Sequence, residues 1–235
     1  MPTSTNCAVV VLAAGAGTRM KSAKQKTLHE IGGRSLLSHA LHAAAGINPE
    51  RIVAVVGHQR DQVAPAVEAV AAELDREVLQ AVQAEQNGTG HAVQCGLEPI
   101  PDFDGTVIVT NGDVPLLTAE TIGALLTAHD DSGAAVTVLS MRQDDPTGYG
   151  RIVRNNAGDV TAIVEQKDAD EATKAITEVN SGVFAFDGAI LRDALTRLDS
   201  DNAQGELYLT DVLGIAREAG HAVRAHVADD PRELA

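Results

Sequence analysis

The residues best suited to chemistry lie near the start of the chain, in a segment of small and basic side chains. Residues 12–20 have the sequence LAAGAGTRM, and no acidic residue occurs before Glu30 in a chain whose formal charge is −15. Four basic residues fall within eight positions here: Arg19, Lys21, Lys24 and Lys26. Small residues let backbone N–H groups approach an anion closely, and the cations add charge-assisted hydrogen bonds. The segment is therefore a candidate polyphosphate site.

The glycines of this segment do not match two common nucleotide-binding motifs. Walker A requires GxxxxGK[ST], which is not present, and Met20 stands where the third glycine of GxGxxG would be. Neither a P-loop ATPase nor a dinucleotide-dependent dehydrogenase is predicted.

The composition limits the possible partners. The 235 residues include 33 Asp and Glu, 18 Lys and Arg and only 2% aromatic residues, which disfavours nucleic acid and anionic membranes. Cys7 and Cys95 lie far apart, so no disulfide framework or thiolate zinc site is predicted. No basic leader precedes the apolar run at 8–14, which is too short to span a membrane. We therefore expect a cytoplasmic protein.

Short β-branched runs alternate with alanine-rich amphipathic segments, which predicts a mainly parallel α/β sheet. Strands are expected over residues 8–13, 51–56, 106–110 and 135–139, with weaker ones over 78–83, 151–154, 160–165 and 182–186. Helices are expected over residues 36–45, 62–74, 89–97, 119–128, 189–198 and 207–218. Helices become sparse after Ala134, so we expect one domain, 1–235, with a nucleotide lobe at 1–133 and a second lobe at 134–235.

A carboxylate follows one of these strands. Asn111, Gly112 and Asp113 come directly after the strand at 106–110, and ligands of open α/β sheets bind beyond the carboxyl ends of strands. Asp113 is therefore expected to face the crevice, where one carboxylate with phosphate oxygens and water suits Mg²⁺. The alternative is that Asp113 caps the turn before Pro115.

Two glutamines, Gln83 and Gln86, precede the turn Gly88-Thr89-Gly90. A glutamine amide donates and accepts at once, which suits the carbonyl and imide N–H edge of uracil. Thr89 is also expected to cap the helix that begins there.

Seven blocks of the chain resemble one enzyme family. The opening segment, followed by a lysine and the pair LH, is similar to the start of nucleotidyltransferases that activate sugar phosphates. Six blocks follow in order: residues 83–91 (QAEQNGTGH), 111–116 (NGDVPL), 145–152 (DPTGYGRI), 164–169 (VEQKDA), 178–182 (EVNSG) and 202–211 (NAQGELYLTD). Together they resemble the uridyltransferase half of the bifunctional bacterial N-acetylglucosamine-1-phosphate uridyltransferases, and the blocks at 83–91 and 202–211 are the most specific.

The resemblance implies a fold and a reaction. The fold is Rossmann-like, with a mainly parallel mixed sheet of the nucleotide-diphospho-sugar transferase (GT-A-like) type. The reaction is Mg²⁺-dependent transfer of UMP from UTP to N-acetylglucosamine-1-phosphate, giving UDP-N-acetylglucosamine and pyrophosphate for peptidoglycan and cell-wall precursors. The attacking phosphate is already ionised at neutral pH, so positioning and charge neutralisation suffice without a general base.

The resemblance also implies roles for individual residues. Those that would bind the uridine nucleotide are Leu12, Ala13, Ala14, Gly15, Gln83, Gly88, Thr89 and Asn111. Those that would bind the sugar are Gly112, Gly150, Glu165 and Asn180. Arg19 and Lys26 would be catalytic through their contacts with the phosphates, and Asp113 would bind Mg²⁺.

The chain departs from the family pattern at several points. Gln25 stands where the family usually has proline, which predicts a less rigid loop, and Asn111 replaces a bulkier residue. The GVNN motif, whose Asn supplies a second Mg²⁺ ligand, and the C-terminal β-helix of hexapeptide repeats are both absent from these 235 residues. We therefore expect no acetyltransferase activity, and a trimer only where that domain is present.

Two other functions stay open from the sequence. A cytidylyltransferase or other nucleotidyltransferase acting on a small phosphate would share the opening loop but would not need the block at 83–91. A truncated nucleotide-sugar-binding module would bind the nucleotide without releasing pyrophosphate.

Overall fold

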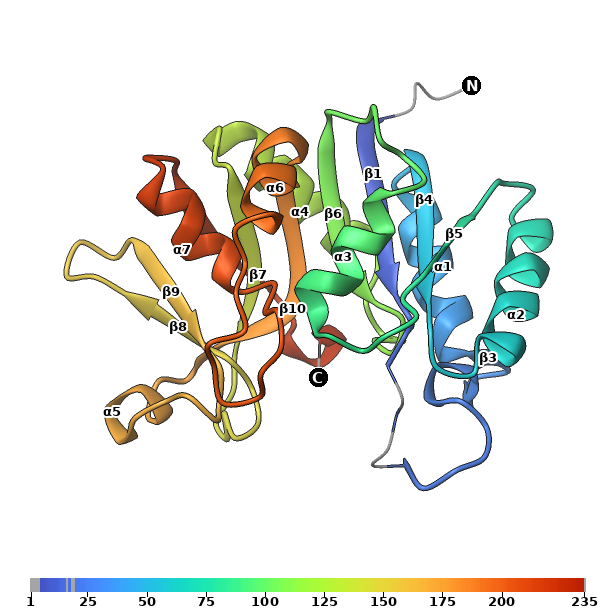
Figure 1. The fold of residues 1–235 in the computed structure, drawn as a ribbon, viewed down its shortest axis with the longest axis horizontal. Coiled ribbons are helices and arrows are strands. Elements are labelled where there is room, and N and C mark those ends of the chain that lie inside the picture. The colour runs from blue at the N-terminus through green and yellow to red at the C-terminus, as the bar shows by residue number, and fades with distance from the viewer. Residues whose placement is uncertain (1–4, 16, 18–19, 235) are drawn as a thin grey trace.

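The computed structural model describes residues 5–15, 17 and 20–234. The main sheet of the described residues has nine strands, and seven of them form its continuous row: β1 (Thr5–Leu12), β4 (Pro49–Val56), β5 (Leu79–Val82), β6 (Thr106–Asn111), β7 (Val136–Arg142), β10 (Glu178–Asp187) and β11 (Val223–Val227). Their order is β11-β7-β10-β6-β1-β4-β5, and Figure 1 labels the six strands from β7 to β5. Strands β6, β1, β4 and β5 are parallel, β11 is parallel to β7, and β10 is antiparallel to both of its neighbours.

Helices cover both faces of this sheet. They are α1 (Leu36–Gly46), α2 (Arg60–Glu73), α3 (Thr89–Leu97), α4 (Ala119–Ser132), α6 (Gly188–Leu195) and α7 (Asp211–Glu218). One buried cluster joins α3, α6 and α7 to the sheet, and the other joins α1, α2 and α4 to the opposite face. Because β1 lies between these two layers, its central residues are apolar without alternation.

Several smaller elements lie beside the long strands of the sheet. A hairpin of β8 (Arg151–Arg154) and β9 (Val160–Val164) pairs with β10 and extends to one side with the short helix α5 (Glu171–Lys174) (Figure 1). A two-residue hairpin joins β2 (Glu30–Ile31) to β3 (Arg34–Ser35), and two 3₁₀ turns are η2 (Lys26–Leu28) and η3 (Pro231–Leu234). No helix in the described parts of the chain is long and apolar enough to cross a membrane.

The predicted fold class is confirmed, and most elements lie within a few residues of their predicted positions. The helix predicted from 207 is wrong in its first turn, because residues before Asp211 pack across α3 instead: Leu207 N donates to Asn87 O and Gly90 N donates to Leu207 O. Thr89 does not cap α3, since the N-cap is Gly88. The division into two functional lobes stays a prediction.

An ion pair links the β8–β9 hairpin, called the side hairpin below, to β10 of the main sheet. Arg154 Nε and Nη2 donate to the two carboxylate oxygens of Glu178 at 2.9 and 2.7 Å, and Ser140 Oγ donates to one of them at 2.8 Å. Burial alone raises the pKa of Glu178, but the hydrogen bonds from Arg154 and Ser140 outweigh burial and lower that pKa. The ionised form of Glu178 therefore stabilises the folded state.

We expect Arg154→Met to lower the free energy of unfolding by about 2 kcal/mol at neutral pH, because a buried carboxylate loses its charged partner. The difference from the parent should shrink as the pH falls below the ordinary pKa of a glutamate and Glu178, whose pKa in the folded state is lowered, takes up a proton. Urea denaturation measures both effects. Arg224→Met is the matched control, because Arg224 lies 3.9 Å from Asp159 and both side chains are about half exposed. Equal losses in the two variants would contradict the stabilising role of the Arg154 pair.

Candidate active site

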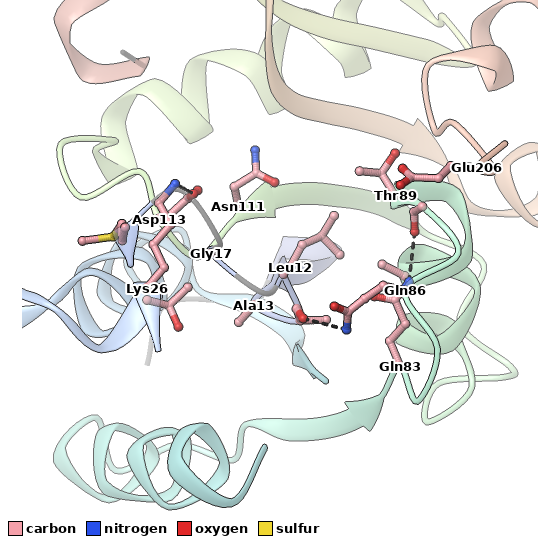
Figure 2. Close-up of a pocket in the computed structure, with 16 residues that line it drawn as sticks. Leu12, Ala13, Gly17, Lys26, Gln83, Gln86, Thr89, Asn111, Asp113 and Glu206 are labelled. Carbon is pink, nitrogen blue, oxygen red and sulfur yellow. Dashed lines mark hydrogen bonds and ion pairs between the residues drawn. The ribbon is translucent and has the colours of Figure 1, made fainter. Parts of the chain in front are cut away.

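A cavity of about 660 Å³ opens where β1 and β6 end and α3 begins (Figure 2). Residues from five separate segments line it: Leu12, Ala13, Ala14, Gly15, Gly17, Met20, Lys26, Thr27, Gln83, Gln86, Gly88, Thr89, Ala92, Asn111, Asp113 and Glu206. The carboxyl ends of parallel strands meet at this edge, which is the usual ligand site of open α/β sheets.

The turn after β1 is held from two directions. The Ala14 carbonyl accepts hydrogen bonds from His58 N at 3.2 Å and from Gln86 Nε2 at 3.0 Å. Gly17 has a φ of +59°, and a Cβ atom there would lie 2.7 Å from Lys26 Cβ. Only glycine therefore allows the turn to pass so close to Lys26.

A lysine and a carboxylate meet on one side of the cavity. Lys26 Nζ lies 2.5 Å from Asp113 Oδ2, and the two side chains keep about a third of their surface exposed, at 33% and 30% (Figure 2). Lys26 is the first residue of the short turn η2, whereas Asp113 follows β6, so the pair joins segments 87 residues apart. The arrangement places an ammonium group and a carboxylate side by side on one wall of the cavity, where a phosphate would lie within reach of both.

The opposite side of the cavity is built around Gln83. The Gln83 side chain is 4% exposed, and its Nε2 donates to Gly88 O at 3.0 Å with His91 Nδ1 3.4 Å away. Gly88 has a φ of +103°, and a Cβ atom there would lie 2.5 Å from Leu207 O. The segment before α7 therefore packs directly on this turn and brings Glu206 to the cavity.

Three of the four predicted sugar-binding residues, Gly150, Glu165 and Asn180, form a separate group beside the β8–β9 hairpin and on β10. Asn180 N donates to Gly150 O at 2.8 Å, and a Cβ atom on Gly150 would lie 3.2 Å from Glu165 Oε1. Burial raises the pKa of Glu165, and the Thr210 hydroxyl, 3.4 Å away, acts in the opposite direction. Gly150, Glu165 and Asn180 are not among the residues that line the cavity.

Asn111 lies next to β10 at the edge of the cavity. It lines the cavity at the end of β6, and its Nδ2 would lie 2.5 Å from a Cβ atom on Gly182, whose φ is +82°. Gly182 belongs to the irregular stretch of β10 that follows Asn180. A side chain at position 182 would therefore displace Asn111.

All residues predicted to bind the uridine nucleotide line the cavity, as do Lys26 and Asp113. Gly112 does not line it, and its N donates to Leu12 O at 2.8 Å. Arg19 lies outside the described residues. Sequence reasoning assigned no site role to Thr27, Ala92 or Glu206, which also line the cavity, although Glu206 falls inside a block that resembles the family.

A family model described as "MobA-like NTP transferase domain" matches residues 9–208. The chain belongs to this family. The bifunctional protein GlmU of Corynebacterium aurimucosum is 74% identical to this MobA-like domain over 98% of the chain and 47% of the relative. That of Streptomyces avermitilis is 61% identical over 97% of the chain and 47% of the relative. The chain thus spans about half the length of the curated relatives it matches, and the resemblance found in its sequence is confirmed.

A solved structure shares the fold of this MobA-like domain. A crystal structure of UDP-glucose pyrophosphorylase complexed with UDP-glucose superposes with a TM-score of 0.72 and 15% identity, over 92% of this chain and 89% of the other. At that identity the match establishes the fold alone. It confirms the predicted sheet of the nucleotide-diphospho-sugar transferase type.

Proposed function

We propose that this domain transfers UMP from UTP to N-acetylglucosamine-1-phosphate, giving UDP-N-acetylglucosamine and pyrophosphate for cell-wall precursors. The observation that carries the proposal is a single cavity whose walls combine a small-residue turn, the Lys26–Asp113 pair and the Gln83 amide. The names of the relatives support it, since they are bifunctional proteins of which this chain matches about half. We propose the reducing cytoplasm as its location, because the sequence has only two cysteines, Cys7 and Cys95, and both are buried.

The orientation of Gln83 favours uracil over cytosine. Gly88 O can only accept a hydrogen bond, so the nitrogen of the Gln83 amide faces it and Oε1 is left as an acceptor. N3 of uracil carries a hydrogen and donates, whereas N3 of cytosine accepts. A base whose N3 contacts Gln83 Oε1 would therefore be a uracil.

The sugar would be bound by the group on the side hairpin and β10. Glu165 and Asn180 offer a carboxylate and an amide, which form directional hydrogen bonds with hydroxyl and acetamido groups. Gly150 brings its backbone next to both residues. Gly112, at the turn after β6, is retained as a further proposed sugar contact.

In the proposed reaction, an oxygen of the sugar phosphate forms a bond to the α-phosphorus of UTP. The bond from that phosphorus to the oxygen bridging to the β-phosphate breaks, and pyrophosphate leaves. Lys26 would neutralise the reacting phosphates, and Arg19 with backbone N–H groups of the turn would hold the β- and γ-phosphates. The ionised sugar phosphate needs no base to remove a proton.

The donor set at Asp113 fits Mg²⁺. Mg²⁺ in phosphate-transfer sites is commonly held by one or two carboxylates, with phosphate oxygens and water as the other ligands. Asp113 lines the cavity with a partly exposed carboxylate. When bound, Mg²⁺ would neutralise charge on the phosphates.

Pyrophosphate release by this chain with Mg²⁺, UTP and N-acetylglucosamine-1-phosphate tests the proposal, beside a reaction with CTP and one without the sugar phosphate. Release that requires both UTP and the sugar phosphate would support it. Release with CTP in preference to UTP would favour a cytidylyltransferase. Binding of UDP-N-acetylglucosamine without release would favour a nucleotide-sugar-binding module.

We expect Gln83→Leu to reduce the preference for UTP over CTP by about tenfold, the value of one hydrogen bond of about 1.4 kcal/mol. The ratio of kcat/KM for the two nucleotides measures this effect. Gln94→Leu is the matched control, because Gln94 also donates from Nε2 to a backbone carbonyl, Leu195 O at 2.8 Å, but does not line the cavity. An unchanged ratio in the Gln83 variant would remove Gln83 from base recognition.

A further inference from the structure

One buried amide beside the cavity has no role in the site described above. The Gln25 side chain is 2% exposed and lies directly before Lys26. Its Nε2 donates to Gly15 O at 2.7 Å, while its Oε1 accepts from both Thr27 N and Thr27 Oγ1 at 2.6 Å. Gly15 and Thr27 both line the cavity.

These bonds fix the orientation of the amide. Gly15 O can only accept, so the nitrogen must face it, and Thr27 N can only donate, so the oxygen must face Thr27. Burial makes each of these bonds costly to lose, because water does not replace the missing partner. The Gln25 amide therefore joins the turn after β1 to the segment that carries Lys26.

A second glutamine holds the same segment from the outside. Gln62, on α2, accepts from Gln25 N at 3.3 Å through Oε1 and donates to Ala23 O at 3.3 Å through Nε2. The backbone of Gln25 has φ −58° and ψ 141°, which is the φ that a proline ring would impose. A chain of polar contacts thus runs from α2 through Gln25 to Gly15.

We propose that Gln25 is a positioning residue for nucleotide binding, which holds the Gly15 turn and Lys26 at a fixed separation around the phosphates. The inference rests on the proposed function. Lys26 occupies one side of the cavity with Gly17 directly against its Cβ atom, so a shift of either segment changes the space left for phosphate. A fixed separation also avoids the entropy cost of ordering both segments when the nucleotide binds.

Gln25→Glu is the decisive variant. A carboxylate still accepts from Thr27, but it places an oxygen against Gly15 O in place of the donor. We expect kcat/KM for UTP to fall by about tenfold, while KM for N-acetylglucosamine-1-phosphate at saturating UTP stays within about twofold of the parent value. A general loss of folded protein would instead lower kcat and leave the KM values for both substrates unchanged.

Gln94→Glu is the matched control, since it makes the same change at another donor to a backbone carbonyl, Leu195 O, away from the cavity. It is expected to keep the parent KM for UTP. If Gln25→Glu unfolds more readily than this control, the uncharged Gln25→Met decides the question. That variant also frees the Thr27 amide, whose hydrogen exchange should become faster.

A parent-like KM for UTP in Gln25→Glu and Gln25→Met would overturn the inference. An equal rise in KM for both substrates would also overturn it, because that result indicates a structural role alone. A parent chain that releases no pyrophosphate would contradict the proposed function instead. UTP affinity by calorimetry then tests Gln25, and equal affinities in parent and variants would overturn the inference on its own.

Discussion

Replacing Lys26 with Met is expected to lower kcat for pyrophosphate release by about 10²- to 10³-fold, while the thermal midpoint stays near that of the parent. The rate falls because the Lys26 ammonium would neutralise charge that develops on the reacting phosphates, and one such donor is typically worth this factor. Stability changes little because the Lys26–Asp113 pair is about one-third exposed, and such pairs contribute at most about 1 kcal/mol. Steady-state kinetics and thermal denaturation measure the two effects.

Lys174→Met is the matched control for that change. Lys174 also forms an ion pair, with Glu171 at 2.8 Å, but on the exposed helix α5 away from the cavity. It should leave kcat unchanged. Parent-like turnover in Lys26→Met would remove Lys26 from the proposed chemistry, whatever happened to its stability.

Asp113→Asn is expected to lower kcat by a similar factor, about 10²- to 10³-fold, for a different reason. An amide oxygen keeps the shape of the ligand but loses the negative charge that Mg²⁺ prefers. The Mg²⁺ concentration needed for half-maximal rate should therefore rise, and part of the activity should return at high Mg²⁺. A titration of the rate with Mg²⁺ at saturating UTP makes this measurement.

The two variants differ in their response to metal. Excess Mg²⁺ should restore part of the rate in Asp113→Asn but none in Lys26→Met, because only the first change weakens a metal ligand. Asp131→Asn, on the exposed end of α4, controls for the loss of one negative charge. If Asp113→Asn shows the same Mg²⁺ dependence as the parent, Asp113 is not the ligand.

Much of the fold could be predicted from local sequence. Strands β1, β4, β6 and β7 are nearly continuous apolar runs, which is typical of strands covered on both faces. Strand β11 could not be predicted in this way, because only Val223 of its residues is buried and Arg224 and His226 break the apolar pattern. Its pairing with β7 depends on a contact between segments distant in sequence.

The residues proposed to bind the nucleotide could be predicted from the sequence more readily than the hydrogen bonds that hold their segments in place. Gln83 and Asp113 follow strands within recognisable blocks, so their place at the sheet edge could be predicted. The replacement of proline by Gln25 predicted a less rigid loop, but the Gln25 side chain forms hydrogen bonds to Gly15 and Thr27. The bond to Gly15 depends on the folded path of the turn, which local sequence preferences do not encode.

The position of the proposed sugar-binding residues was also only partly predictable from the sequence. Residue types at Gly150, Glu165 and Asn180 suggested polar recognition, and the structure places them together around one backbone turn. The sequence placed these residues in a second lobe, but their exact position outside the main cavity depends on where β10 carries Asn180 relative to Asn111 on β6.

The position of β10 also determines how this chain can be divided for engineering. β10 comes from the second half of the sequence yet lies between β6, from the first half, and β7. A fragment ending at the boundary near residue 133 would leave the apolar strand β6 with an unpaired edge, and such edges recruit other chains into aggregates. The two predicted lobes are therefore unsuited to exchange as modules at that boundary, and chimeras with related proteins are better made by replacing the surface loops around the cavity.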